Sequence, residues 1–263
     1  MVVVTAGAVS MVMLAAGYLV VGRHSLTAFA DDGQDVVSAP KTTAAAAQAA
    51  PPAPAAGTAS ASPTEQLPTA IAGLGPKTRA KIPAATTQVL VASGKAKNSS
   101  DSLVTLWSRT KDGHWKPGVT WAGHNALDGW TTLHHAGDLH SPIGVYTLSD
   151  AGGFDPHPGS KLPYYHSSEF QAGGVGFDGE PLDQAFDYVI AIDYNRVPGN
   201  SPLDGSQPLG EDRGGGIWVH VDHGGPTHGC VSVAASHMVE LLRTLVPADH
   251  PVIVMGDRVS LSS

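Results

Sequence analysis

The feature that most restricts how this chain can fold is a stretch of low sequence complexity near its N-terminus. From Asp31 to about Gln66 the sequence is mostly Ala, Pro, Ser, Thr and Gly, and residues 42–66 read TTAAAAQAAPPAPAAGTASASPTEQ. Such a segment has no hydrophobic period and buries too little apolar surface to offset the chain entropy lost on folding. We therefore expect a semi-extended, disordered linker over residues 31–66, which leaves residues 67–263 to form one globular domain.

The segment before this linker has the character of a targeting sequence. Residues 2–21 carry no charge and are long enough to span a bilayer, and Ala28-Phe29-Ala30 has the small-x-small pattern of a signal-peptidase site. Two interpretations fit residues 1–30: a signal peptide cut after Ala30, or an uncleaved signal anchor. In either case we expect the protein to act outside the cytoplasm and to contact a membrane only through this segment.

Charge and cysteine content exclude several classes of protein. The formal net charge is −8, from 15 Lys and Arg against 23 Asp and Glu, and no basic run is present. This balance argues against nucleic acid as a partner. A single cysteine, Cys230, rules out an internal disulfide and a cysteine-rich metal cluster.

The domain reads as mainly β. Its 31 Gly and 20 Pro, counted over the whole chain, favour turn-rich β structure over a helical bundle. The segments predicted as strands are 87–92, 102–107, 114–121, 144–148, 188–192, 216–219 and 251–255, with a further short run after Cys230. The first two are expected to form a hairpin, and Pro117 is expected to interrupt the third, an edge strand.

One amphipathic helix is predicted over residues 236–245. Met238, Leu241, Leu242 and Leu245 recur at helical spacing, and Pro247 ends the pattern. Strands of this number with one or two packed helices predict a β-sandwich.

The lone cysteine is the candidate reactive residue. Gly229 precedes Cys230 and allows close approach to the sulfur, and His220 lies ten positions upstream, at the end of a predicted strand. An imidazole beside a thiol lowers the thiol pKa and activates it as a nucleophile. A free thiol in an exported protein is otherwise exposed to oxidation, which supports a reactive role over that of a small buried apolar residue.

These residues belong to a longer pattern that resembles the L,D-transpeptidase catalytic domain, the YkuD-type family. The similarity is carried by Thr227-His228-Gly229-Cys230-Val231, by Gly137 to Tyr146 (GDLHSPIGVY), by Ile192-Asp193-Tyr194-Asn195 and by Gly123-His124-Asn125. Pro226-Thr227 is similar to a secreted bacterial branch of that family. The resemblance covers most of residues 67–257 and implies a β-sandwich of mixed sheets.

The resemblance implies a role for each matching residue. Cys230 is the nucleophile and His220 the general base, later the general acid. Thr227, His228 and Gly229 fill the motif, and backbone N–H groups from His228 to Cys230 form an oxyanion hole. Two departures are the short loop between His220 and Cys230 and Ser232, which stands where an Arg or Asn is common.

The resemblance also implies the reaction. The Cys230 thiolate attacks the carbonyl between an L-centre and the terminal D-Ala of a peptidoglycan stem peptide. An amine of a neighbouring stem then resolves the thioester as a 3→3 cross-link, whereas water as acceptor gives an L,D-carboxypeptidase. Neither route needs a metal or another cofactor. Carbapenems are expected to acylate the same cysteine.

Other polar residues have structural as well as functional interpretations. Trp218 shares the alternating face of His220 and is a candidate cleft residue. Asp138 and Asn195 are also candidate cleft residues. Their simpler roles are a loop cap for Asp138 and a hydrogen bonder at a strand end for Asn195. His223 is expected in a solvated loop. A zinc peptidase built on the histidines is less favoured, because no zinc-peptidase motif is present, and a non-catalytic wall-binding module on the same fold stays open.

Overall fold

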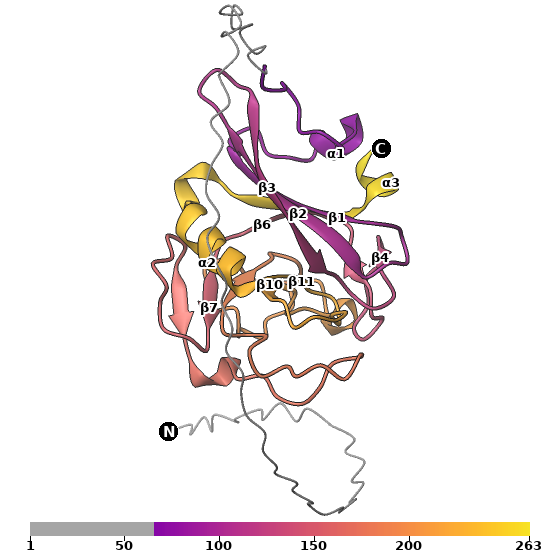
Figure 1. Ribbon diagram of the computed structural model, residues 1–263, viewed down its shortest axis with the longest axis vertical. Coiled ribbons are helices and arrows are strands. Elements are labelled where there is room, and N and C mark those ends of the chain that lie inside the picture. Colours follow the sequence, from indigo (N-terminus) through magenta and orange to yellow (C-terminus); the bar gives the residue numbers. More distant parts are fainter. Residues whose placement is uncertain (1–65) are drawn as a thin grey trace, which may run out of the picture. The chain divides into compact units, whose positions relative to one another are not determined.

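A five-stranded mixed sheet forms the first layer of the domain in the computed structural model, which describes residues 66–263. Its strand order is β3-β2-β1-β12-β6, and only the β1–β12 pair is parallel. The strands are β1 (Gln88–Gly94), β2 (Asp101–Arg109), β3 (Trp115–His124), β6 (Gly144–Thr147) and β12 (Val252–Asp257). The predicted hairpin of β1 and β2 and the edge position of β3 are confirmed (Figure 1).

Pro117 does not interrupt β3 as predicted. The strand is continuous from Trp115 to His124, and the ladder with β2 instead changes register between Thr105 and Trp107. Proline has no backbone N–H. It is tolerated here because β3 is an edge strand, with no further strand on its outer side that would need this donor.

The second sheet is also five-stranded and mixed, and it carries the cysteine. Its order is β11-β10-β9-β7-β8. The strands are β7 (Ala151–Gly153), β8 (Tyr164–His166), β9 (Val189–Ala191), β10 (Trp218–Val221) and β11 (Val231–Val233), and a separate parallel pair is formed by β4 (Trp130–Thr131) and β5 (Ser141–Pro142).

Among the described residues only one α-helix is longer than four residues. It is α2 (Ala235–Thr244), within one residue of its predicted bounds, and it buries Met238, Leu241 and Leu242. The short helices are α1 (Pro76–Arg79) and α3 (Arg258–Leu261), with 3-10 turns η1 (Ser168–Phe170), η2 (Glu211–Arg213) and η3 (Pro247–Asp249).

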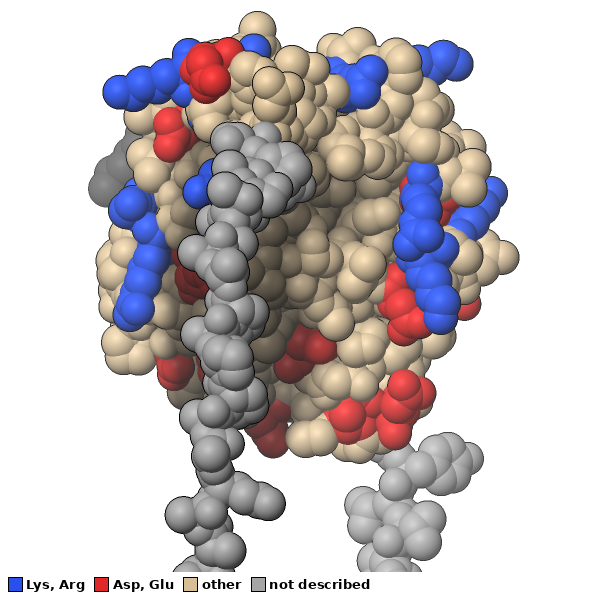
Figure 2. All heavy atoms as spheres, turned by 45° about the horizontal axis from the view of Figure 1, so that its top comes forward, with Lys and Arg blue, Asp and Glu red and all other residues tan. Residues whose placement is uncertain are grey.

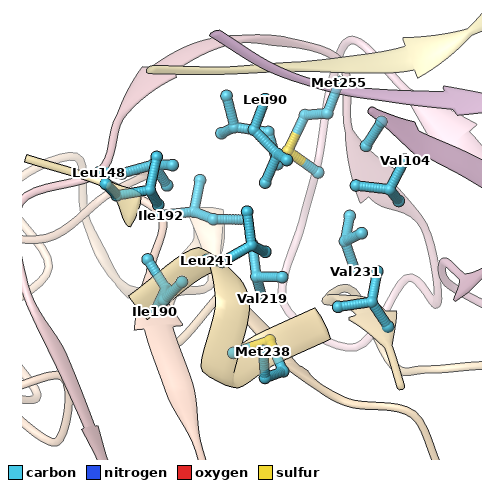
Figure 3. Packing of buried hydrophobic residues seen from close by; sticks show 14 of the residues in the cluster. Leu90, Val104, Leu148, Ile190, Ile192, Val219, Val231, Met238, Leu241 and Met255 are labelled. Carbon is cyan, nitrogen blue, oxygen red and sulfur yellow. The ribbon is translucent and has the colours of Figure 1, made fainter. Parts of the chain in front are cut away.

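The main core lies between the two sheets and α2. Figure 3 shows Leu90, Val104 and Met255 of the first sheet above Val219, Val231 and Leu241 of the second sheet and the helix. All of these side chains are fully buried, which by apolar transfer stabilises each by about 1.5–3 kcal/mol. The β-sandwich of mixed sheets with packed helices is therefore confirmed.

A second core covers the opposite face of the first sheet. Because side chains alternate along β1, Leu90 points to the main core and Val89 and Val91 point outward. These two pack with Ile71 and Leu74 from the start of the domain. The first sheet is thus covered on both faces, which explains why β1 is almost entirely buried.

The predicted signal segment, residues 1–30, lies outside the described residues, as does the predicted linker except for Gln66. Within the described range, none of the helices combines the length and the apolar character that crossing a membrane would require.

Candidate active site

Cys230 and His220 are brought to one face of the second sheet by two neighbouring strands. Strands β10 and β11 run parallel, with Val219 opposite Val231 and His220 opposite Ser232. Since Val219 and Val231 point into the main core (Figure 3), alternation places His220 on the other face. Cys230 directly precedes Val231, the first residue of β11, so the same alternation places its side chain on the face of His220. The Sγ of Cys230 accepts the backbone N–H of Trp218 at 3.4 Å.

The imidazole of His220 is buried and held in one tautomer. Its Nδ1 lies 2.8 Å from the carbonyl oxygen of Val221, and because a carbonyl only accepts, Nδ1 carries the proton. The lone pair is therefore on Nε2. Burial lowers the pKa of His220 to about 4, although the Val221 contact opposes this shift.

The thiol of Cys230 is neutral as well. Burial raises its pKa to about 11, partly offset by the N–H of Trp218. Within residues 66–263 no hydrogen bond joins Cys230 to His220; the nearest polar contact of Sγ besides Trp218 is the carbonyl oxygen of Gly216 at 3.7 Å. These pKa shifts favour a thiol and a neutral imidazole in the resting site.

Two buried hydroxyls fix the peptide of Cys230. Thr227 Oγ1 donates to the Cys230 carbonyl at 2.7 Å, and Ser141 Oγ donates to the same oxygen at 3.3 Å. Thr227 Oγ1 also accepts the Gly229 N–H at 3.3 Å. In the described part of the chain, the N–H groups of His228 and Cys230 donate no hydrogen bond, so these two stay available to an incoming oxygen.

The short loop after β10 is anchored at its start by Asp222. Its Oδ1 lies 2.8 Å from Nδ1 of His124 and accepts from Ser232 Oγ at 3.0 Å. Burial works against ionisation, but His124 and the other donors lower the pKa of Asp222 to about 2, and Asp222 in turn raises the pKa of His124. Ser232, which departs from the family pattern, therefore holds this loop.

A glycine-rich loop lies against the other end of the same motif. We call residues 171–185 the covering loop; its turn is closed by the N–H of Gly176 donating to the Glu180 carbonyl at 2.8 Å. Phe177 packs on the His228 ring with centroids 4.6 Å apart, and Glu180 pairs with His223 at 3.0 Å. His228 is thus turned toward this loop, and none of its contacts is with His220 or Cys230 in the described chain.

The expectation that His223 is a solvated loop residue is wrong. Its side chain is 6% exposed, and its ring stacks on His220 at 5.7 Å with an interplanar angle of 7°. Phe186 meets His220 edge-on at 5.4 Å. His220, the candidate general base, is therefore enclosed by His223 and by Phe186. The contact with Glu180 holds His223 in this place.

Trp218 lies on β10 two residues before His220, on the same face of the sheet, as the alternation of side chains along this strand predicts. Its ring packs edge-on against Phe186 at 5.1 Å and Phe170 at 5.8 Å. The indole Nε1 is buried with no hydrogen-bond partner among residues 66–263. The indole of Trp218 therefore keeps an unused donor within this aromatic cluster.

Asp138 acts as a loop cap. Its carboxylate accepts the N–H groups of His135 at 2.8 Å and His140 at 3.0 Å, and it lies 2.9 Å from Nδ1 of the buried His134. Burial opposes its ionisation, but these donors lower the pKa of Asp138. The capped loop reaches the motif, because a Cβ on Gly229 would lie 3.8 Å from the His134 ring.

Asn195 is a buried strand-end hydrogen bonder, 5% exposed. Its amide nitrogen donates to the carbonyls of Gly210 and Gly214, and its oxygen accepts the Leu209 N–H at 2.6 Å. With every polar atom in use inside the protein, its contribution is to hold the loop that leads to Gly216, next to the sulfur.

The histidines do not gather as a metal site. In residues 66–263 no group of three His, Cys, Asp or Glu side chains has the arrangement of metal ligands. His134 is paired with Asp138, His223 with Glu180 and His124 with Asp222.

Three functional contacts were missed in the sequence. Ser141 is part of the Ser-Pro pair that the resemblance pointed to, so its place in the family pattern was the available signal. Glu180 and Asp222 had none, because their partners lie 43 and 98 positions away along the chain.

Fold and site together define a class: a mixed β-sandwich that presents a cysteine and a tautomer-fixed histidine on one face of its second sheet. Residues 90–254 match the family described as the L,D-transpeptidase catalytic domain, YkuD, and the chain belongs to this family. Its membership supports an L,D-transpeptidase-family activity on peptidoglycan. No curated protein and no solved structure matches the chain.

Proposed function

We propose that this protein is a cysteine acyltransferase that cross-links peptidoglycan stem peptides outside the cytoplasm. The observation that carries the proposal is the pairing of β10 with β11, which supports placing Cys230 on the same face of the sheet as a buried His220 whose Nδ1 is tied to Val221. Family membership supplies the substrate class. The uncharged N-terminal run supports the location.

The chemistry follows from these groups. Nε2 of His220 accepts the thiol proton as Sγ of Cys230 attacks the carbonyl before the terminal D-Ala. The N–H groups of His228 and Cys230 stabilise the oxyanion. His220 then returns the proton to the departing amine of D-Ala, which leaves an acyl-thioester. An amine of a neighbouring stem attacks this thioester, and the product is a 3→3 cross-link with the thiol regenerated.

The test is to incubate the protein with tetrapeptide stems and follow the products by mass spectrometry. We expect free D-Ala and stem dimers, both lost in Cys230→Ala and both insensitive to a chelator. Tripeptide without dimers would identify water as the acceptor and overturn the cross-linking step. Activity that survives Cys230→Ala would overturn the thioester, and no product from the wild type would leave a wall-binding module.

A carbapenem tests the thiol separately from the acceptor. We expect a mass adduct on Cys230 that forms in the wild type and is strongly slowed in His220→Gln, because the imidazole no longer takes the thiol proton. An adduct that forms at the same rate in both proteins would contradict the role of His220.

A further inference from the structure

A cavity of about 260 Å³ lies on the face of the first sheet that points away from Cys230. Its walls include Ile71, Ile82 and Trp115, which belong to or pack against the second core. The opposite face of this sheet packs on the sheet that carries the dyad. The cavity is therefore separated from the catalytic site by a full layer of the domain.

Two arginines at this cavity have unused charge. Arg79 and Arg109 both line it, and neither forms an ion pair with a carboxylate of residues 66–263. Arg79 donates one N–H to the Leu74 carbonyl at 2.9 Å, and the Arg109 guanidinium lies 5.9 Å above the Trp115 ring. Both guanidinium groups keep most of their donors for a ligand.

A buried hydroxyl is the second, independent sign of a ligand. Thr86 is 1% exposed and lines the same cavity. Its Oγ1 has no hydrogen-bond partner in the described chain. A buried polar atom without a partner is unfavourable, and a group in the cavity that accepts this O–H, once the Thr86 side chain turns toward it, removes the penalty.

The surroundings of the cavity are basic in a chain that is acidic overall. Residues 66–124 contain eight Lys and Arg against two Asp, whereas residues 125–250 contain four Lys and Arg against sixteen Asp and Glu. Figure 2 shows the asymmetry on one face, with most basic side chains in the upper half and most acidic ones below. The acidic neighbours of the cavity are already engaged: Asp112 with His114, and Asp249 with Thr87.

We propose that this cavity binds the terminal phosphate of an anionic phosphate polymer. A terminal phosphate presents three non-bridging oxygens, enough to meet two guanidinium groups and the Thr86 hydroxyl together, whereas a carboxylate, like an internal phosphodiester, has only two. The volume suits one unit of a polymer rather than a large ligand. The further cations Lys77, Lys81, Lys111 and Lys116 flank the lining segments in sequence, and a ligand whose charge repeats along its length uses them as well.

Such binding would hold the enzyme on a polyanion while Cys230 acts on stems at the other side of the domain. This attachment role rests on the extracytoplasmic location proposed above, but the binding itself does not depend on the catalytic proposal.

The experiment measures binding of short-chain polyphosphate to the full chain by calorimetry, with polyglutamate of matched charge as the carboxylate probe. We expect the double variant Arg79→Gln/Arg109→Gln to bind polyphosphate at least about tenfold more weakly. The matched control Lys95→Gln/Lys97→Gln removes the same charge from the same basic region but not from the cavity, and we expect it to bind within about twofold of the wild type. Thr86→Val should weaken binding by a smaller factor.

Three outcomes would overturn the proposal: equal losses in the two double variants, polyglutamate binding as tightly as polyphosphate, or no binding of polyphosphate to the wild type. Arg109→Gln alone, which alters an exposed side chain, keeps the test valid if the double variant does not fold. Cys230→Ala should bind polyphosphate like the wild type, so failure of the catalytic proposal and failure of this one are distinguishable.

Discussion

Desolvation favours the uncharged forms of both Cys230, which is half-buried, and His220, which is fully buried. The pKa of the thiol is raised to about 11 and that of the imidazole is lowered to about 4. The nearby Asp222 favours the charged imidazole, but desolvation outweighs it. In the mechanism proposed above, Cys230 is therefore activated by proton transfer to His220 during attack, while backbone N–H groups stabilise the developing oxyanion.

The first prediction concerns the acidic side of the pH–rate profile. His220 must be neutral to accept the thiol proton, and a lowered pKa keeps it neutral to lower pH. We expect kcat/KM for D-Ala release to fall only as pH approaches about 4 and not near the ordinary histidine value of about 6.5. Initial rates measured across this range check the point, with the thermal stability of the protein followed in the same buffers. A limb centred near the ordinary value, with the protein still folded, would contradict the burial argument.

Thr227 carries the second prediction. Replacing it with Val removes the 2.7 Å hydrogen bond to the Cys230 carbonyl and leaves only the longer one from Ser141. A small displacement of a nucleophile lowers the rate strongly, so we expect kcat to fall by about 10- to 100-fold with little change in KM. The free energy of unfolding should fall by about 1–3 kcal/mol, because the buried Cys230 carbonyl loses a donor.

Thr227→Ser is the control, because it keeps the hydroxyl, and its kcat and its free energy of unfolding should stay near those of the wild type. If the Ser variant is as slow as the Val variant, the hydroxyl is not what positions Cys230.

At the scale of elements, the covering loop is held to the motif by one contact of a carboxylate with a histidine and by one aromatic contact. Glu180→Gln removes the carboxylate that contacts His223, and Phe177→Ala removes the packing on His228. We expect each change to raise KM several-fold, because the loop then holds His223 and His228 less firmly near Cys230 and His220. Asp178→Asn is the matched control, since it removes a carboxylate of the same loop that pairs with no cation in the described residues. Equal effects from Asp178→Asn and Glu180→Gln would assign the change to loop charge and not to the His223 contact.

The strands that could be predicted are those with strong local signals. β1 and β12 are runs of Val, Ile and Leu buried on both faces, and their predicted ranges agree with the structure to within a few residues. β7 and β8 were not predicted, because three-residue strands made of Gly, Ala and aromatic residues have no local pattern and form through pairing alone.

The site residues also divide into those with a local sequence signal and those without one. Cys230, His220 and Thr227 lie in one short stretch of sequence, so a motif was enough to find them. Glu180, Asp222 and the enclosed position of His223 depend on contacts between segments far apart in sequence, which single-sequence reasoning does not supply.

At the scale of the whole domain, the two ends of the described chain close the second core together. The N–H of Gly75 donates to the Leu261 carbonyl at 2.8 Å, and that of Lys77 donates to the Ser263 carbonyl at 3.0 Å. Leu74 and Leu261 are both almost fully buried in this core. The segment before β1 is therefore part of the folded unit, and stability depends on residues far from the chemistry.

Leu74→Ala separates stability from catalysis, because the second core and the dyad lie on opposite sides of the first sheet. Truncating a leucine that is 4% exposed should lower the free energy of unfolding by about 2–5 kcal/mol. The control Leu133→Ala, at a side chain that is 66% exposed, should change it by less than about 0.5 kcal/mol. Denaturant unfolding gives both values.

Below the melting temperature of Leu74→Ala, we expect its kcat to match that of the wild type, since the β10–β11 pairing that places His220 and Cys230 on one face is untouched. A loss of kcat in the folded variant would show that strain in the first sheet reaches the dyad, and the two layers would then have to be treated as mechanically coupled.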